Sequence, residues 1–347
     1  MRKLKHQNTN YLLYDFNKFW RFVPLHRPQK EVLKQIFFSM FPFYFQRWAA
    51  YQNWKNARQF SSNNHKFGTS DFWYRKLYLS HQINLTKPDN LVVKPLESVR
   101  LAIVLHIYYD DIFREIIKLL DASEFKDFTL YITSPAHLSN TINEILSKTS
   151  YQYFLITVEN RGRDIMPFLK ILPKVFEDGH QLVLKLHTKG SNHFKRRALW
   201  RNDLFEKLIG EGNLKKNIQV FSQNPHIGML GPTGNILLMS VYYGANALAV
   251  AMLGSKLGVE KKQIQNLCFV AGSMFFARKE ALLPILNLGI TDADFEAEDN
   301  QIDGTLAHAV ERAFGLGLIV SGLQLADSAS IPEKPCCRIS MNHYFTV

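Results

Sequence analysis

Residues 101–187 repeat one pattern, in which a short apolar run of buried-strand type is followed by a segment whose apolar residues recur at helical spacing. Strands separated by helices require crossover connections and therefore predict a parallel sheet. Because such crossovers are almost always right-handed, the carboxyl ends of these strands meet at one edge of the sheet. We expect strands at 101–107, 128–133, 153–158 and 182–186, and helices at 110–120, 138–146 and 165–176.

The later segments continue this pattern with less regularity. We expect a strand at 269–277 that Gly272 interrupts, a helix at 303–314, a last strand at 318–321, and a mobile basic loop at 192–199. The predicted fold class is α/β, with a Rossmann-like, mostly parallel sheet flanked by helices and a basic, aromatic-rich helical region before it.

The excess of positive charge lies in the first hundred residues. Residues 1–100 carry 17 Lys and Arg against 5 Asp and Glu, whereas residues 101–347 carry 25 of each. Together with the change of pattern near residue 98, this predicts a basic region at 1–98, an α/β domain at 99–330 and a C-terminal tail at 331–347.

The basic region is also rich in large aromatic residues. Trp48, Tyr51 and Trp54 recur at three-residue spacing and would give a helix one aromatic face. Basic amphipathic helices of this kind suit an anionic membrane surface. The alternative is that the aromatic side chains pack on the α/β domain while Lys and Arg are solvated. We expect no nucleic-acid binding, because no recognised nucleic-acid module is present.

Three features bear on the cellular compartment. No apolar run reaches the roughly 20 residues that a membrane-spanning helix needs, and the N-terminus lacks the pattern of a signal peptide. The 3 cysteines are too few for a disulfide framework. We therefore expect a cytoplasmic protein that works in solution or on the inner face of the cytoplasmic membrane.

A first polar cluster follows the third predicted strand. Gly162 permits a tight turn, and the free N–H groups where the next helix starts favour an anion. Arg161 and Arg163 carry fork-shaped donors that suit phosphate. The alternative is a surface turn in which Asp164 caps the helix. The strand-end position favours a phosphate-binding role for the whole cluster: Glu159, Asn160, Arg161, Gly162, Arg163 and Asp164.

A second cluster, His187, Thr188 and Lys189, follows the fourth predicted strand. Lys189 would neutralise a diphosphate, and His187 would bind a phosphate or, as a second option, a metal ion. A lone histidine is usually structural, so this prediction depends on the pairing with Lys189 at a strand end.

A third cluster consists of an acidic loop, residues 295–303, and the helix after it. One of its carboxylates would deprotonate a hydroxyl as that hydroxyl attacks a sugar carbon. On the helix, His308, Glu311 and Arg312 fall at three- and four-residue spacing and share a face. The alternative is that Asp303 or Thr305 caps the helix and the remaining groups are solvated or ion-paired. The acidic side chains of the loop are Glu296, Glu298, Asp299 and Asp303.

Together these motifs resemble the rhamnan synthesis protein F family of bacterial rhamnose-containing polysaccharide and lipopolysaccharide assembly. The resemblance covers about residues 100–325 and is carried by 159–164, 185–189, 200–201, 272–275 and 301–312. It implies a glycosyltransferase of GT-A type that uses a nucleotide sugar such as dTDP-rhamnose and a glycan or lipid-linked acceptor. By the same resemblance, the substrate site includes further residues beyond the two strand ends: Gly272, Gln301, His308, Glu311 and Arg312.

GT-A enzymes hold Mg²⁺ or Mn²⁺ with an Asp-x-Asp at the end of the fourth strand, and the inverting ones use a carboxylate base late in the domain. Here His187-Thr188-Lys189 stands at that strand end. The resemblance therefore leaves two options, cationic side chains that offset the phosphate charge, or a metal held by His187 with an acid such as Asp164. Asp303 is the first choice for the base and Glu298 the second. The alternative function is a non-catalytic subunit that binds a sugar nucleotide or glycan.

Overall fold

The computed structural model describes residues 36–38, 40–45, 51, 100–188, 195–265, 267–299, 301 and 303–328. Near the N-terminus it describes the short helix α3 (Pro42–Phe45) and the buried residues Phe38 and Tyr51, whose rings meet edge to face with centroids 5.4 Å apart. The predicted membrane contact of residues 1–98 and the predicted tail at 331–347 depend on residues outside these ranges, so both stay predictions.

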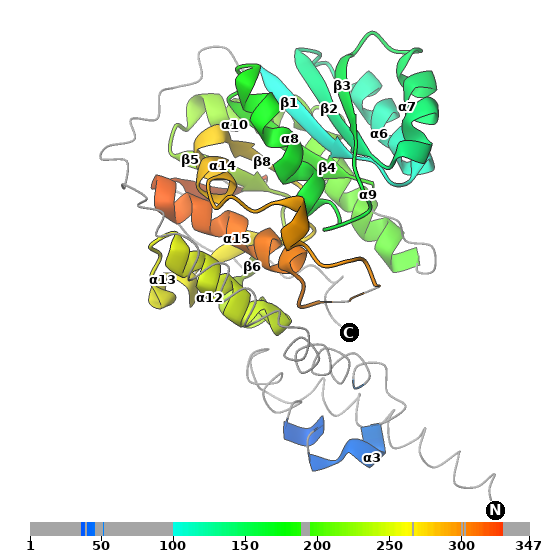
Figure 1. Cartoon of the computed structure of the whole chain (residues 1–347). Helices are drawn as coiled ribbons and strands as arrows, with labels where there is room; N and C mark the ends of the chain where they lie inside the picture. The colour runs from blue at the N-terminus through cyan, green and yellow to red at the C-terminus, as the bar shows by residue number, and fades with distance from the viewer. Residues whose placement is uncertain are drawn as a thin grey trace, which may run out of the picture.

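Within the described residues, seven strands form the central sheet in the order β3-β2-β1-β4-β8-β5-β9 (Figure 1). All run parallel except β8, which is antiparallel to its neighbours β4 and β5. The predicted mostly parallel sheet is therefore confirmed. The strands are β1 (Leu101–His106), β2 (Phe128–Ser134), β3 (Gln152–Thr157), β4 (Leu182–His187), β5 (Ile227–Gly231), β8 (Phe275–Arg278) and β9 (Gln324–Asp327).

Helices cover both faces of this sheet, because successive side chains of each strand point to opposite sides. Leu101, Ile103 and Leu105 of β1 belong to the apolar cluster under α6, α7, α9 and α10, whereas Ala102 and Val104 belong to the cluster under α8, α12, α14 and α15. These helices are α6 (Asp110–Ala122), α7 (Ser139–Leu146), α8 (Ile165–Glu177), α9 (Lys195–Ile209), α10 (Asn213–Gln223), α12 (Ala247–Lys256), α14 (Lys279–Leu286) and α15 (Leu306–Ser321).

Short elements complete the described part of the chain. They are the 3-10 helices η2 (Ala136–Leu138), η3 (Gly244–Asn246) and η4 (Asp292–Asp294), the helices α11 (Met239–Tyr242) and α13 (Lys261–Gln265), and a separate antiparallel pair, β6 (Ile236–Leu238) and β7 (Cys268–Val270).

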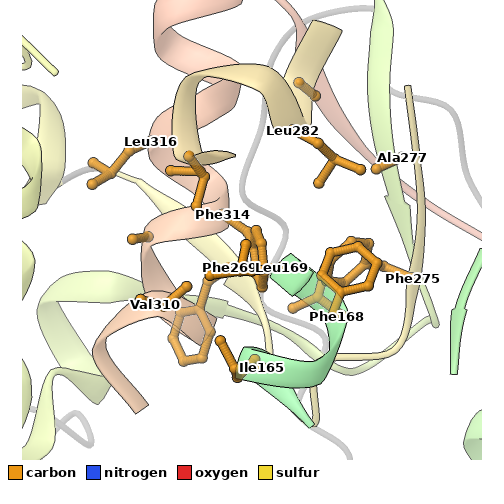
Figure 2. Close-up of a cluster of buried hydrophobic side chains, with 14 of the residues drawn as sticks. Ile165, Phe168, Leu169, Phe269, Phe275, Ala277, Leu282, Val310, Phe314 and Leu316 are labelled. Carbon is orange, nitrogen blue, oxygen red and sulfur yellow. The ribbon is translucent and has the colours of Figure 1, made fainter. Parts of the chain in front are cut away.

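The core on one side of the sheet joins α8 and α15 (Figure 2). Phe314 of α15 meets Phe168 of α8 and Phe275 of β8 edge to face, with ring centroids 5.7 and 5.2 Å apart. All three side chains are almost completely buried. This aromatic packing fixes the two helices relative to the sheet, and so also the polar loops that lead into them.

Three local predictions are wrong. Residues 269–277 do not form one strand, because Gly272 and Ser273 adopt positive φ values of 86° and 54° and send β7 and β8 into different sheets. Residues 318–321 are the last turn of α15, which is apolar nearly all round because it is buried on most sides. The predicted loop at 192–199 is helical from Lys195 onward.

Cys268 is buried on β7 and is disulfide-bonded. In the part of the chain that the structure describes, no helix has both the length and the apolar character needed to cross a bilayer.

Candidate functional site

The loop from β3 to α8 holds two consecutive residues in the left-handed region, Gly162 at φ +64° and Arg163 at φ +56°. A Cβ on Gly162 would lie 2.6 Å from the Cβ of Met166, so only glycine fits there. For Arg163 the positive φ is a strained conformation, which persists where the surroundings over-determine it. The loop is therefore held in one shape.

The acidic loop lies against this turn, as the sequence predicts. Arg161 forms an isolated antiparallel bridge with Ala297. Arg163 donates its backbone N–H to Glu298 Oε1 at 3.1 Å, and its Nη2 donates to the carbonyl oxygen of Gln301. The first and third polar clusters thus meet, although they are more than 130 residues apart in the chain.

A buried ion pair joins the same turn to β4. The Nζ of Lys185, whose side chain is 1% exposed, bonds to the carboxylate of Asp164 and donates to the carbonyl oxygen of Ser273 at 2.9 Å. His187 Nε2 lies 2.9 Å from the carbonyl oxygen of Gly272 and 3.8 Å from Asp164 Oδ2. Because a carbonyl only accepts, Nε2 carries a proton. Asp164, Lys185 and His187 are called the strand-end cluster below.

The charges of this cluster perturb two titrating groups. Burial by itself raises the pKa of Asp164, but the neighbouring His187 and Lys185 outweigh it and hold the pKa well below its usual range. His106 lies directly across from His187 in the register of β1 and β4. Burial lowers the pKa of His106 to about 4, with Asp164 opposing and Lys185 adding to that shift. His106 is therefore neutral at pH 7.

The turn before β8 closes the cluster from another side. Gly272 donates its backbone N–H to Glu311 Oε1 of α15 at 2.8 Å. A Cβ on Gly272 would lie 3.0 Å from the ring of Trp200 of α9, whose Nε1 donates to Asn235. Beside this turn, the buried hydroxyl of Ser273 has no hydrogen-bond partner among the described residues. The turn thus joins β4, α9 and α15 at the carboxyl edge of the sheet.

Asp303, the first choice for a catalytic base, is engaged with the protein. Its Oδ2 accepts the backbone N–H of Ala245 at 3.0 Å, its Oδ1 accepts from Asn246 Nδ2 at 2.6 Å, and Arg312 Nη2 lies 3.8 Å away. Burial raises the pKa of Asp303, but Arg312 and these hydrogen bonds bring it below its ordinary value. The carboxylate ties η3 to the region where α15 begins.

Side chains cap the start of α15. Thr305 is one of them, as the capping alternative for the third cluster predicts. His308 Nδ1 and Thr305 Oγ1 are 2.8 Å apart, and Glu296 accepts the backbone N–H of Leu306 with both carboxylate oxygens. Burial and, after it, the charge of Arg163 lower the pKa of His308 to about 4. His308 is thus neutral at pH 7 and close enough to Arg163 of the 159–164 loop to be affected by its charge.

Comparison with known proteins identifies the family. The model of rhamnan synthesis protein F matches residues 61–320. The chain belongs to the rhamnan synthesis protein F family. Two relatives, each named uncharacterized protein WxcX, come from Xanthomonas campestris pv. campestris strains B100 and ATCC 33913. Each is 36% identical over 251 residues, which cover 72% of this chain and 35% of WxcX, so the chain spans about a third of the relatives' length.

Membership in the rhamnan synthesis protein F family points to a role in rhamnan or polysaccharide synthesis. Every contact of the strand-end cluster and of the acidic loop described above lies inside the matched region. Among the predicted site residues of this family member, Asn160 is exposed on the loop surface, and Lys189 lies outside the described residues. The prediction for Lys189 therefore remains open.

Two groups of the site were not predicted as site residues, Lys185 and His106. The sequence does contain a signal for Lys185. A lysine within an apolar strand is buried only when its ammonium pairs with an acidic or hydrogen-bonding group, which would mark it as part of a polar cluster. His106 ends the first strand of the predicted sheet, and only the register of β1 against β4 reveals that it faces His187.

A cavity of about 430 Å³ lies elsewhere in this rhamnan synthesis protein F member, at the amino edge of the sheet. Its lining comes from the beginnings of β1, β2 and β3 and from the segments before them. None of the predicted site residues contributes to it. The lining includes Arg100, Lys126, Thr129, Gln152 and His180.

Proposed function

We propose that this chain is a glycosyltransferase of GT-A type. It moves a sugar, rhamnose or a related deoxysugar, from a nucleotide-sugar donor to a growing cell-surface polysaccharide or lipopolysaccharide. Family membership supports a role in rhamnan synthesis. Open α/β folds bind nucleotides beyond the carboxyl ends of their strands, which is the edge that gathers the polar groups here.

One observation carries the proposal. A single turn, residues 159–164, is bound to two distant segments at the carboxyl edge of the sheet. Its Arg163 contacts Glu298 and Gln301 of the acidic loop, and its Asp164 contacts Lys185 of β4. Cationic groups suited to a diphosphate and carboxylates suited to proton transfer therefore lie at one edge.

The proposed reaction is a direct displacement at the anomeric carbon. The acceptor hydroxyl oxygen forms the new C–O bond while the bond from that carbon to the diphosphate oxygen breaks. The diphosphate leaves with the bonding electron pair, and the hydroxyl proton passes to a carboxylate. Attack on the face opposite the leaving group inverts the configuration. Guanidinium groups of Arg161 and Arg163 suit the charge that develops on the leaving diphosphate.

Glu298 is the better candidate for the base than Asp303. Both oxygens of Asp303 already accept hydrogen bonds, and its pKa lies below the ordinary value, which weakens it as a proton acceptor. Among the described residues, Glu298 accepts a hydrogen bond only through Oε1, its Oε2 lies 3.9 Å from Arg163 Nε, and its side chain is 24% exposed. We therefore assign proton transfer to Glu298 and the positioning of η3 to Asp303.

The test is a turnover assay on the full chain with a panel of nucleotide sugars that includes dTDP-rhamnose, and a rhamnan oligosaccharide as acceptor. We expect Glu298→Gln to lower turnover by about 100-fold or more, the usual contribution of a general base, without changing the melting temperature. Asp303→Asn should instead lower the melting temperature, because one of the two accepting oxygens becomes an NH₂ donor that faces an existing donor, either the N–H of Ala245 or Nδ2 of Asn246.

Full turnover in Glu298→Gln would remove Glu298 as the base. Turnover lost in Asp303→Asn with an unchanged melting temperature would return the base assignment to Asp303. If no donor in the panel binds or turns over, the glycosyltransferase proposal itself is wrong.

A second candidate function is a non-catalytic subunit that binds a sugar nucleotide or glycan. It is favoured by the fact that two cations of the site already have partners within the protein: Lys185 bonds to Asp164, and Arg163 bonds to Gln301. Calorimetric titration would support this function if a donor binds while no acceptor in the panel yields product.

A further inference from the structure

The GT-A type proposed above implies a divalent cation at the end of β4. The groups that stand there are already committed to other contacts. The ammonium of Lys185 fills the space beside Asp164 and has almost no exposure. A divalent ion bound to Asp164 through Oδ2 would have to displace this ammonium and leave it buried without its counter-charge, which is strongly unfavourable.

Two further polar atoms at this strand end, His187 Nε2 and Thr188 Oγ1, offer no free lone pair either. His187 Nε2 carries a proton, because it donates to the carbonyl oxygen of Gly272. The hydroxyl oxygen of Thr188 accepts the backbone N–H groups of Tyr108 and Tyr109 at 2.7 and 3.0 Å. A metal ligand needs an available lone pair, so His187 through Nε2 and Thr188 through Oγ1 do not fit a divalent ion.

An Asp-x-Asp tripeptide does occur in the sequence, as Asp292-Ala293-Asp294, but it forms the 3-10 helix η4. Asp294 accepts the backbone N–H and the hydroxyl of Thr291 in a capping box, and Asp292 pairs with Lys170. Among the described residues, no three His, Cys, Asp or Glu side chains gather where they could hold a metal ion.

We infer that this chain binds the diphosphate of its donor through side-chain cations and without a divalent metal ion. The inference rests on the proposed function, because it concerns the same site. The cation best placed for the task is Arg161: it is half-buried on the 159–164 turn, and its guanidinium has no hydrogen bond or ion pair among the described residues. A guanidinium grips phosphate oxygens in pairs and requires no metal to do so.

The experiment is calorimetric titration of the full chain with dTDP, once in excess EDTA and once with MnCl₂. We expect the dissociation constants in the two buffers to agree within about threefold. Arg161→Gln should weaken dTDP binding in EDTA by about tenfold or more, as the loss of a paired charge-assisted contact predicts. Arg100→Gln is the matched control, since Arg100 is exposed and lines the cavity at the opposite edge of the sheet, and it should leave binding unchanged.

The outcomes separate this inference from the proposed function. Binding that appears only with Mn²⁺, or becomes more than tenfold tighter with it, overturns the inference and keeps the proposed function. Equal binding in both buffers that is unaffected by Arg161→Gln overturns the role of Arg161. If neither dTDP nor any other nucleoside diphosphate binds in the two buffers, both the inference and the proposed function are wrong.

Discussion

Replacing Lys185 with methionine isolates the contribution of the buried ion pair. Methionine keeps an unbranched chain against the ring of Phe168, over which Nζ now lies 5.2 Å from the centroid, but it lacks the ammonium. The Asp164 carboxylate, 17% exposed, would then remain largely buried without its main partner. Breaking such a pair costs about 3–5 kcal/mol, so we expect the free energy of unfolding at pH 7 to fall by about that amount.

The loss should depend on pH. In the wild-type chain the pKa of Asp164 is lowered from 3.8, so its stabilising contribution is present above that pH and is lost as the pH falls below it. In Lys185→Met, burial acts on Asp164 with less opposition, and its pKa rises. Urea denaturation should therefore show a difference of about 3–5 kcal/mol at pH 7 that shrinks toward pH 3.

Two further variants complete this test. Lys185→Met combined with Asp164→Leu should recover most of the lost stability, because replacing both charges with apolar groups is often neutral. Lys148→Met is the control, since it breaks an exposed pair with Glu144 and should leave the unfolding free energy nearly unchanged. A loss below about 1 kcal/mol for Lys185→Met at pH 7, or an equal loss at pH 3, would refute the reasoning.

Three other predictions follow from buried groups. Gly317→Ala places a Cβ 2.1 Å from the carbonyl oxygen of Ala281, so α14 and α15 must separate, and urea denaturation should show a loss of about 1–3 kcal/mol. Arg278→Met leaves unpaired the buried backbone carbonyls to which Arg278 donates, and we expect a loss of about 3 kcal/mol or more in the same assay. Burial lowers the pKa of His106 and His308 from 6.5 to about 4 in the folded chain. As the pH falls from 6.5 to about 4, these histidines therefore bind protons in the unfolded chain but not in the folded one, and the unfolding free energy should decrease. A flat pH profile in that window would contradict the buried, neutral state of both histidines.

The parallel half of the sheet was predictable because its strands are continuous apolar runs between amphipathic helices, a pattern that permits little else. The predictions failed where a helix is buried on most sides, because its sequence then lacks the polar face that distinguishes it from a buried strand. The end of α15 is apolar on nearly every side and looks like a strand at 318–321. The break at Gly272 was visible, but its consequence was not, because two residues at positive φ redirect the chain into a second sheet.

For the candidate site, the sequence predicted which loops meet but not which groups pair. Topology alone brings the turn at 159–164 and the end of β4 to the same edge. By contrast, the partner of Asp164 depends on side-chain direction, because alternation along β4 decides whether Lys185 faces the turn. The sequence singled out the carboxylate of Asp303 as a candidate, whereas its bonds to Ala245 and Asn246 are not local in sequence and required the fold.

A crystal structure of the full chain with a bound nucleoside diphosphate tests the central claim most directly. The account predicts the diphosphate at the carboxyl edge of the sheet, within hydrogen-bonding distance of Arg161 and beside the strand-end cluster. A nucleotide bound instead in the cavity at the amino edge, which Arg100 and His180 help to line, would contradict it.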